Sequence, residues 1–179
     1  MSKIVVLCGS VRKNGNTEML ARAFCDGARL NNEVDFVSVA DFRVLPCIGC
    51  NTCFEREGNA CFQNDDMQAI YRKLADADML VIASPVYFYG ISAQLKAVID
   101  RLHTPLRNTF RIRKTALLLV AAATLPEVFD SIKTQYRLVC SFFNLEDAGS
   151  VCVRGVREKG DIAGNPALAE ARALGSSLV

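Results

Sequence analysis

The chain has 179 residues, 51% of them apolar, and its formal net charge is only +2. This length and apolar fraction suit one α/β domain with a well-buried core. Acidic and basic residues are interspersed, so the charge gives no reason to expect a nucleic acid or an anionic membrane surface as partner.

The first ten residues, MSKIVVLCGS, hold one lysine and a short apolar stretch that runs into a glycine turn. They lack the charged, apolar and cleavage regions of a signal peptide. The longest apolar run, Ala116 to Ala123, is far shorter than the roughly 20 residues that span a bilayer. We therefore expect a soluble cytoplasmic protein with a single domain over residues 1–179.

Strand-like and helical patterns alternate along the chain. Runs rich in β-branched residues predict five strands, at Ile4 to Cys8, Val34 to Val39, Met79 to Ala83, Thr115 to Ala121 and Ser150 to Val153. Apolar residues at helical spacing predict helices over 20–28, 67–74, 95–102 and 127–143, and a last helix opening at Asn165-Pro166. Strands that are apolar on both faces indicate a doubly wound parallel sheet in a three-layer α/β/α sandwich, with the flavodoxin-like order 2-1-3-4-5. Ligands of such folds bind at the carboxyl ends of the strands.

The first strand is followed by a polar turn, residues 9–17, which we call the phosphate turn. Its sequence, GSVRKNGNT, places hydroxyls, amides and main-chain N–H groups at the start of a helix, which suits a phosphate. It lacks the ending of a P-loop and the glycine spacing of a dinucleotide fingerprint, so a terminal monophosphate fits it better than an NTP or a dinucleotide. The alternative is an ordinary βα turn in which Asn16 or Thr17 caps the helix.

Four of the eight cysteines lie in the long stretch from 41 to 64, in a cysteine-rich loop at about 46–62. Three of them are spaced at successive three-residue steps, which favours a [4Fe-4S] cluster over zinc. Free thiols or local disulfides are the alternatives. The other cysteines, Cys8, Cys25, Cys140 and Cys152, lie in apolar segments, where we expect small buried side chains without a role.

The third strand ends in SPVYFYG, residues 84–90, which we call the aromatic turn. Three consecutive aromatic residues at the same sheet edge as the phosphate turn favour a site for a planar ring such as the isoalloxazine of a flavin. The alternative is that these side chains fold back onto the core or fill a dimer interface.

These stretches resemble a known family, the flavodoxin-like NAD(P)H-dependent FMN reductases, and within it the iron-sulfur flavoproteins. The resemblance runs nearly end to end. It rests on GSVRKNGNT, on the cysteine run followed by QNDDM, on SPVYFYGISAQLKAVIDR, and on KGDIAGNP before the final helix.

The resemblance implies a binding site for FMN. Around its phosphate would lie Ser10, Arg12, Asn14, Asn16 and Thr17. The ribityl chain and ring would be lined by Pro85, Val86, Tyr87 and Phe88, and approached from the other side by Ala123 and Thr124. Valine at position 11 replaces the proline common in this turn, which alters its stiffness more than its chemistry. The glycines often found near Ala123 are absent.

The resemblance also implies a [4Fe-4S] cluster near a neighbouring subunit's flavin, in a homodimer or homotetramer. Its ligands would be Cys47, Cys50, Cys53 and Cys61. Some relatives keep similar cysteines without a demonstrated cluster. The wide gap before Cys61 is the departure in this chain.

The leading hypothesis is a redox enzyme that moves electrons between NAD(P)H, or a ferredoxin-like donor, and an acceptor. The alternatives are a cluster-free NAD(P)H-dependent FMN or quinone reductase, a non-enzymatic electron carrier, and a zinc-stabilised interaction domain. No side chain is expected to act as catalytic acid or base, because the flavin carries the chemistry. His103, the only histidine, is expected to be solvated or to cap a helix end.

Overall fold

A computed structural model describes residues 1–178 of the chain. Its strands are β1 (Lys3–Cys8), β2 (Glu33–Ser38), β3 (Met79–Pro85), β4 (Lys114–Val120) and β5 (Glu146–Val153). Its α-helices are α1 (Asn16–Ala28), α2 (Thr52–Glu55), α3 (Met67–Ala75), α4 (Ala93–Arg101), α5 (Asp130–Phe143) and α6 (Ala167–Ser176). Short 3-10 turns are η1 (Val39–Asp41), η2 (Glu57–Asn59), η3 (Pro105–Thr109) and η4 (Pro126–Phe129).

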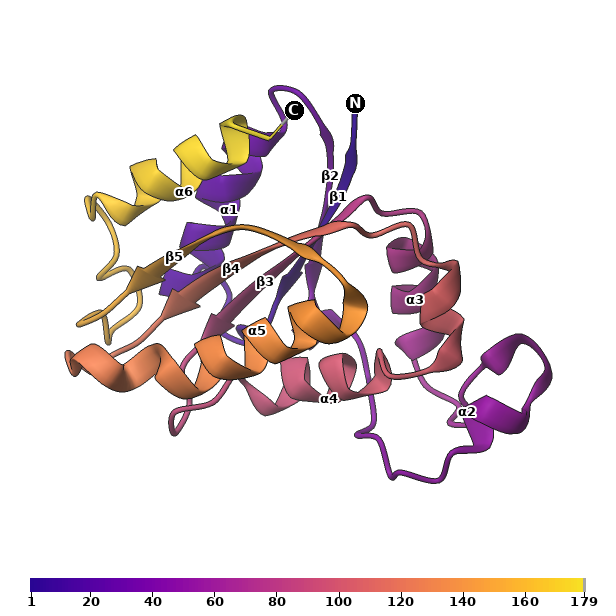
Figure 1. The fold of residues 1–179 in the computed structure, drawn as a ribbon. Helices are drawn as coiled ribbons and strands as arrows, with labels where there is room; N and C mark the ends of the chain where they lie inside the picture. The colour runs from indigo at the N-terminus through magenta and orange to yellow at the C-terminus, as the bar shows by residue number, and fades with distance from the viewer. Residues whose placement is uncertain (179) are drawn as a thin grey trace.

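The five strands form one parallel sheet in the order β2-β1-β3-β4-β5, which confirms the predicted topology. In this register Cys8 at the end of β1 pairs with Ala83, and Pro85 at the end of β3 pairs with Val120. The carboxyl ends of β1, β3 and β4 are therefore adjacent, as the arrowheads in Figure 1 indicate.

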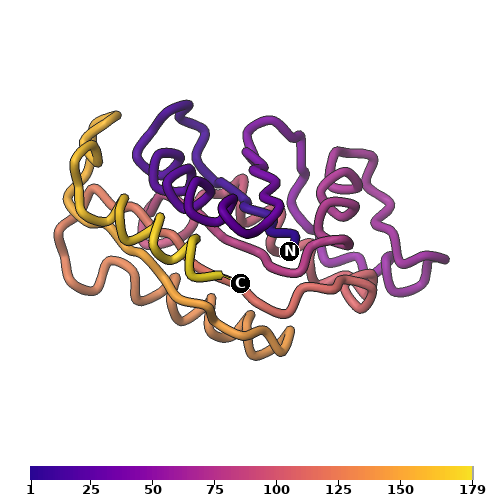
Figure 2. Tube along the Cα trace, turned by 90° about the horizontal axis from the view of Figure 1, so that it is seen from above, coloured from indigo at the N-terminus to yellow at the C-terminus, as the bar shows by residue number. Residues whose placement is uncertain are grey.

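Helices cover both faces of the sheet, so the three-layer sandwich is confirmed (Figure 1). Val5 and Leu7 of β1 point into a core that α3, α4 and α5 close. Ile4 and Val6, at the alternate positions, point into a second core beneath α1 and α6. Figure 2 shows α1 and α6 side by side, with both chain termini close together.

Most predicted boundaries differ from those of the structure by one to three residues, and two of the differences have a clear physical reason. β5 begins at Glu146, four residues before the predicted start, because an exposed edge strand accepts polar residues and a register shift between Thr115 and Leu117 accommodates them. The last helix begins at Ala167 instead of Pro166, and the Asn165 side chain accepts a hydrogen bond from the Ala167 N–H (2.9 Å).

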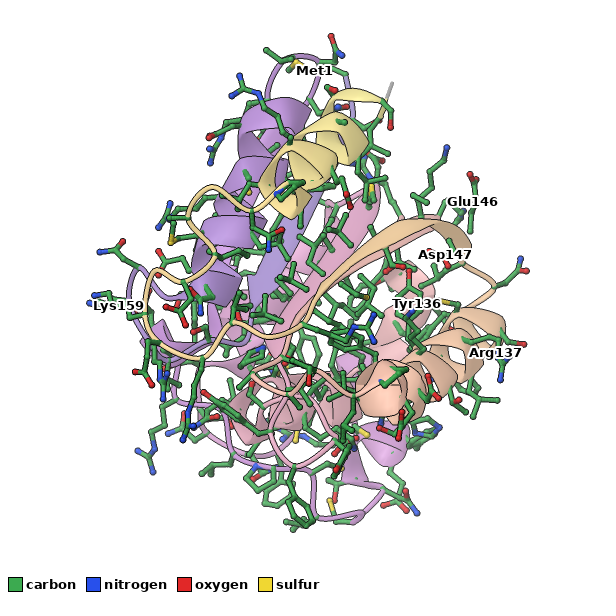
Figure 3. The ribbon with its side chains drawn as sticks, turned by 90° about the vertical axis from the view of Figure 1, so that its left-hand side faces the viewer. Met1, Tyr136, Arg137, Glu146, Asp147 and Lys159 are labelled. Carbon is green, nitrogen blue, oxygen red and sulfur yellow. The ribbon has the colours of Figure 1, made fainter. Side chains whose placement is uncertain are left out.

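A partly buried hydrogen bond joins α5 to the edge strand. The hydroxyl of Tyr136 donates to Asp147 Oδ1 at 2.9 Å, and the two side chains lie next to each other in Figure 3. The bond matters for the site because α5 also forms one wall of the hollow that contains the cysteine-rich loop.

All eight cysteines are free thiols. Cys8, Cys25 and Cys140 are buried, as expected, and Cys152 is half-buried. Burial raises the pKa of the Cys8 and Cys25 thiols to about 11, so both stay protonated at neutral pH. In residues 1–178 no helix combines the length and apolar character required to cross a membrane.

Candidate functional site

The phosphate turn and the aromatic turn lie side by side at the carboxyl edge of the sheet. The Gly9 N–H donates to the carbonyl of Ala83 (2.7 Å), and the Val86 N–H donates to the carbonyl of Val120 (2.8 Å). These bonds continue the strand pairing into the loops. The structure therefore brings together the two turns that the sequence analysis singled out.

Gly9 makes this close approach sterically feasible. A Cβ atom at this position would lie 2.7 Å from Ser92 Oγ and 2.9 Å from Leu95 Cβ. Ser92 also caps α4, where its hydroxyl accepts a hydrogen bond from the Leu95 N–H. The end of β1 thus packs directly against the start of α4, which only a residue without a side chain permits.

Short-range hydrogen bonds shape the phosphate turn. The Arg12 N–H donates to Ser10 Oγ (3.2 Å), and the Gly15 N–H donates to the carbonyl of Arg12 (3.0 Å). Asn14 has a φ of 52° and donates its N–H to Glu18 Oε2 at 2.7 Å. The exposed Arg12 and Asn14 lie on the rim of the turn.

The first turn of α1 is open to an anion. Its N-cap is Gly15, and no side chain caps the helix. Within the described residues, the N–H groups of Asn16, Thr17 and Glu18 have no acceptor. Free N–H groups at the positive end of a helix dipole suit a phosphate. The alternative in which Asn16 or Thr17 caps the helix is therefore not what the structure shows.

The Asn16 side chain is committed to another contact. Its Nδ2 donates to the carbonyl of Glu158 (2.8 Å), and its Oδ1 accepts from the N–H groups of Gly160 (3.0 Å) and Ile162 (3.3 Å). Asn16 therefore holds the loop after β5 beside the phosphate turn. This loop, KGDIAGNP, is among the stretches that carry the family resemblance, and its sequence predicted no role in the site.

The aromatic turn has an uncommon backbone. Tyr87 and Gly90 exchange both main-chain hydrogen bonds (2.9 and 3.0 Å), while Phe88 and Tyr89 have φ values of 48° and 65°. Two positive φ angles make a type I′ turn, which normally contains asparagine and glycine. The Ser131 hydroxyl on α5 donates to the carbonyl of Tyr89 and holds the turn.

The aromatic side chains face outward. Phe88 is 99% exposed, and Tyr87 and Tyr89 are each about half-exposed. The alternative that they fold back onto the core is therefore wrong for Phe88. Val86, by contrast, packs against the core below α4 and α5. An apolar surface of this kind beside an anion site suits a planar ring.

Ala123 and Thr124 follow β4, the neighbouring strand, and both are exposed. The Gly155 N–H donates to the carbonyl of Ala123 (3.2 Å), which joins this segment to the loop after β5. The structure thus places all predicted flavin-site residues on three adjacent loops at one sheet edge.

The cysteine-rich loop lies between β2 and α3 and projects beyond α3 and α4 (Figure 1). All four of its cysteines line one hollow of ≈ 820 Å³, whose other walls come from α4 and α5. The α5 wall runs from Ser131, which also holds the aromatic turn, to Phe143. One hollow therefore adjoins both candidate cofactor sites.

The four thiols share this hollow without converging. Within residues 1–178, no three His, Cys, Asp or Glu side chains are close enough together to hold a metal ion. The Thr52 hydroxyl donates to Cys50 Sγ (3.3 Å), which lowers the pKa of the Cys50 thiol below its usual value. Gln63 Nε2 donates to Cys61 Sγ at 3.9 Å.

A buried ion pair that the sequence analysis missed anchors the cysteine-rich loop. Arg101 donates to Asp65, and their side chains are 2% and 0% exposed. Arg101 Nη1 also donates to the carbonyl of Leu45 (3.2 Å), and the Leu45 N–H donates to Asp65 Oδ2 (2.8 Å). Burial alone would raise the pKa of Asp65, but its hydrogen bonds to Arg101 and to main-chain amides lower it below the usual range. Both residues lie in stretches that carry the family resemblance, QNDDM and SPVYFYGISAQLKAVIDR, but nothing in either stretch indicates that the two side chains meet.

His103 is exposed, as predicted, but it is packed between aromatic rings. Its ring lies 5.7 Å from that of Phe54 in the cysteine-rich loop and 5.5 Å from that of Phe142 on α5. The arrangement joins the loop to α5 and assigns His103 no chemistry.

The sequence profile described as NADPH-dependent FMN reductase matches residues 2–152. The chain belongs to this family. An iron-sulfur flavoprotein from Methanocaldococcus jannaschii is 43% identical over 112 residues, which are 62% of this chain and 56% of that protein. Other archaeal proteins called iron-sulfur flavoproteins match at 37% identity. The matching part of the chain thus spans about half the length of these relatives.

Solved structures show the same fold. An NAD(P)H:quinone oxidoreductase from Methanothermobacter marburgensis superposes with a TM-score of 0.72 at 17% identity, over 98% of this chain and 95% of that one. An FMN-dependent NADH-azoreductase from Bacillus anthracis, solved in complex with FMN, superposes with a TM-score of 0.70 at 15% identity, over 99% of both chains. At these identities the likeness establishes the flavodoxin-like fold.

Proposed function

We propose that the chain binds FMN at the carboxyl edge of its sheet and acts as an NAD(P)H-dependent oxidoreductase. The observation that carries the proposal is the juxtaposition of free N–H groups at the start of α1 with the outward-facing aromatic turn. One turn suits the phosphate of FMN and the other suits its ring. Membership of the NADPH-dependent FMN reductase family supports the same cofactor.

The phosphate site would be formed chiefly by main-chain groups. The N–H groups of Asn16 and Thr17, together with the Ser10 hydroxyl, would donate to the phosphate oxygens, and Arg12 on the rim would supply a positive charge. The Asn16 side chain would act indirectly, because its amide already holds the loop after β5. Asn14 shapes the turn through its left-handed backbone.

The ring would be bounded by Pro85, Val86, Tyr87 and Phe88 on one side and by Ala123 and Thr124 on the other. Bound FMN would supply the redox chemistry, since it accepts two electrons together and returns them singly. The residues of the two turns would position the ring, exclude water from one face and donate main-chain N–H groups to its heteroatoms.

We extend the proposal to a [4Fe-4S] cluster held by Cys47, Cys50, Cys53 and Cys61. In its support, four thiols that could act as soft donors line one hollow, these thiols are free, and the archaeal relatives reported above carry the name iron-sulfur flavoprotein. The loop would have to tighten around the cluster, because its thiols do not converge. The cluster would link the flavin to one-electron partners, such as a ferredoxin-like protein.

The dispersed thiols favour a second candidate, an NAD(P)H-dependent FMN or quinone reductase without a cluster. One measurement separates the two. Protein purified anaerobically would be assayed for its visible spectrum, iron, acid-labile sulfide and released flavin per chain. Flavin with near-stoichiometric iron and sulfide supports the first candidate, whereas flavin without iron after reconstitution supports the second.

The flavin site itself is tested with Thr17→Ala combined with Tyr87→Ala. We expect weaker FMN binding in a fluorescence titration, because the variant changes one wall of each turn. Unchanged affinity would place FMN elsewhere. Leu30→Ala, at an exposed residue beyond the C-terminal end of α1, is the control and should bind FMN as the wild type does.

A further inference from the structure

Arg101 has two donors without an acceptor, although its side chain is only 2% exposed. Nη1 donates to Asp65 and to the carbonyl of Leu45. Among the described residues, Nε and Nη2 have no hydrogen-bond partner. Buried donors in native proteins nearly always have an acceptor, so two orphaned donors on one guanidinium indicate that an acceptor belongs beside them.

The two free groups form one edge of the guanidinium. Nε–H and Nη2–H are parallel donors, the arrangement with which arginine binds anions in a bidentate manner. Asp65 and Leu45 occupy the other part of the group and fix its plane. Arg101 is therefore oriented before any ligand arrives.

The hollow beside Arg101 is the one that the cysteines line. Arg101, Tyr71, Cys53 and Cys61 all belong to its wall. Burial alone would lower the pKa of Arg101, but Asp65 and, to a smaller extent, Cys61 raise it above its usual value. Arg101 and the cysteines line the same hollow, so thiolates there would lie near a buried cation, in surroundings that strengthen their interaction.

We propose that Arg101 is the buried counter-charge of the cysteine site, with Nε–H and Nη2–H donating hydrogen bonds to sulfur in the hollow, chiefly at Cys61. This inference rests on the proposed metal-binding role of the four cysteines and deepens it. Arg101 acts as a positioning residue, since it touches the ligands and their sulfur atoms instead of the metal. Partners of this kind orient metal ligands and tune the bound group.

Two measurements test the role. The first is the Co²⁺ affinity of the apoprotein under anaerobic conditions, followed by the thiolate-to-cobalt charge-transfer absorbance. The second is the reduction potential of the cluster in reconstituted protein. Hydrogen bonds donated to its sulfur atoms stabilise the reduced, more negative form of a cluster, so loss of these donors should lower the potential.

The main variant combines Arg101→Gln with Asp65→Asn, because removing one partner alone would leave a buried unpaired charge. We expect Co²⁺ to bind about 10- to 100-fold more weakly and the cluster potential to fall. Arg22→Gln is the matched control. It removes a positive charge from the ring of Phe36, on the α1 side of the sheet and outside the cysteine hollow, and should leave the affinity unchanged.

Arg101→Lys keeps the charge and can keep the ion pair, but it loses the paired donors. We expect a Co²⁺ affinity between those of the wild type and the double variant. If the double variant does not unfold cooperatively, this single substitution is the test of the proposal. Folded variants with wild-type Co²⁺ affinity and cluster potential would overturn the proposal. So would wild-type protein that binds no Co²⁺ at its cysteines. Wild-type protein that binds Co²⁺ but assembles no cluster would defeat the cluster assignment alone, and the Co²⁺ affinities would still decide the role of Arg101.

Discussion

Asn16 and Gly160 are 144 residues apart in sequence, yet the Asn16 side-chain oxygen accepts a hydrogen bond from the Gly160 N–H at 3.0 Å. The bond ties the first helix to the loop after the last strand. It holds that loop beside the phosphate turn.

Asn16→Ala should loosen the loop after β5 and weaken FMN binding. It removes one donor and one acceptor that serve three main-chain groups, so we expect a loss of about 1–3 kcal/mol in the free energy of unfolding. Thermal unfolding and a flavin titration measure both effects. Asn31→Ala, which removes a long side-chain contact to the carbonyl of Ser176 (3.4 Å), should change neither. A fully stable Asn16→Ala variant would show that the loop is held by other contacts.

The aromatic turn should gain stability from residues that suit its backbone. Phe88→Asn with Tyr89→Gly supplies the pair that a type I′ turn prefers, and left-handed non-glycine residues cost roughly 1–2 kcal/mol each. We expect a melting temperature a few degrees higher, at about 2–4 °C per kcal/mol. FMN affinity should fall, since the aromatic surface is lost.

Leu30→Asn is the control for that variant, because Leu30 is also exposed but has no positive φ. It should leave the melting temperature unchanged. A turn variant that is less stable than the wild type would contradict the interpretation that the backbone of Phe88 and Tyr89 is strained.

Tyr136→Phe should destabilise the protein in a pH-dependent way. At neutral pH the lost bond to Asp147 should cost about 1 kcal/mol. Burial and the bond to Asp147 raise the pKa of Tyr136 above its ordinary value of 10.0. A raised pKa means that its stabilising effect is complete below pH 10 and is lost as the pH rises beyond it, because the unfolded phenol ionises first.

The phenylalanine variant has no such loss, so its stability deficit should shrink between pH 10 and pH 11. Urea unfolding of both proteins at pH 7, 9, 10 and 11 measures the difference. A deficit that stays constant over this range would mean that Tyr136 ionises as easily in the folded protein as in the unfolded chain.

Cys50→Ser should separate the two candidate cofactors. Loss of one of four thiolate ligands should reduce reconstituted iron and sulfide per chain to a small fraction, while the flavin content stays near that of the wild type. Cys25→Ser, in the buried face of α1, tests whether any lost cysteine has the same effect. Full iron content in Cys50→Ser would defeat the proposed ligand set.

Much of this protein followed from its sequence. Strands with apolar residues on both faces alternate with amphipathic helices, and such segments bury their surface in very few ways, so the sheet order 2-1-3-4-5 and the layers were predictable. The same logic located the phosphate and aromatic turns, because the ends of parallel strands meet at one edge. Local spacing also predicted chemistry, since the four cysteines from Cys47 to Cys61 indicated a candidate metal-binding loop.

Contacts between distant segments were decided by the tertiary structure alone. The pairing of Arg101 with Asp65 depends on how α4 packs against the start of α3, and no local pattern encodes that distance. The bond from Asn16 to the loop after β5 likewise joins segments that only the closed sandwich brings together. The outward orientation of Phe88 follows from two positive φ angles, which propensity would not assign to aromatic residues. A sequence specifies which groups are available, whereas packing decides which of them meet.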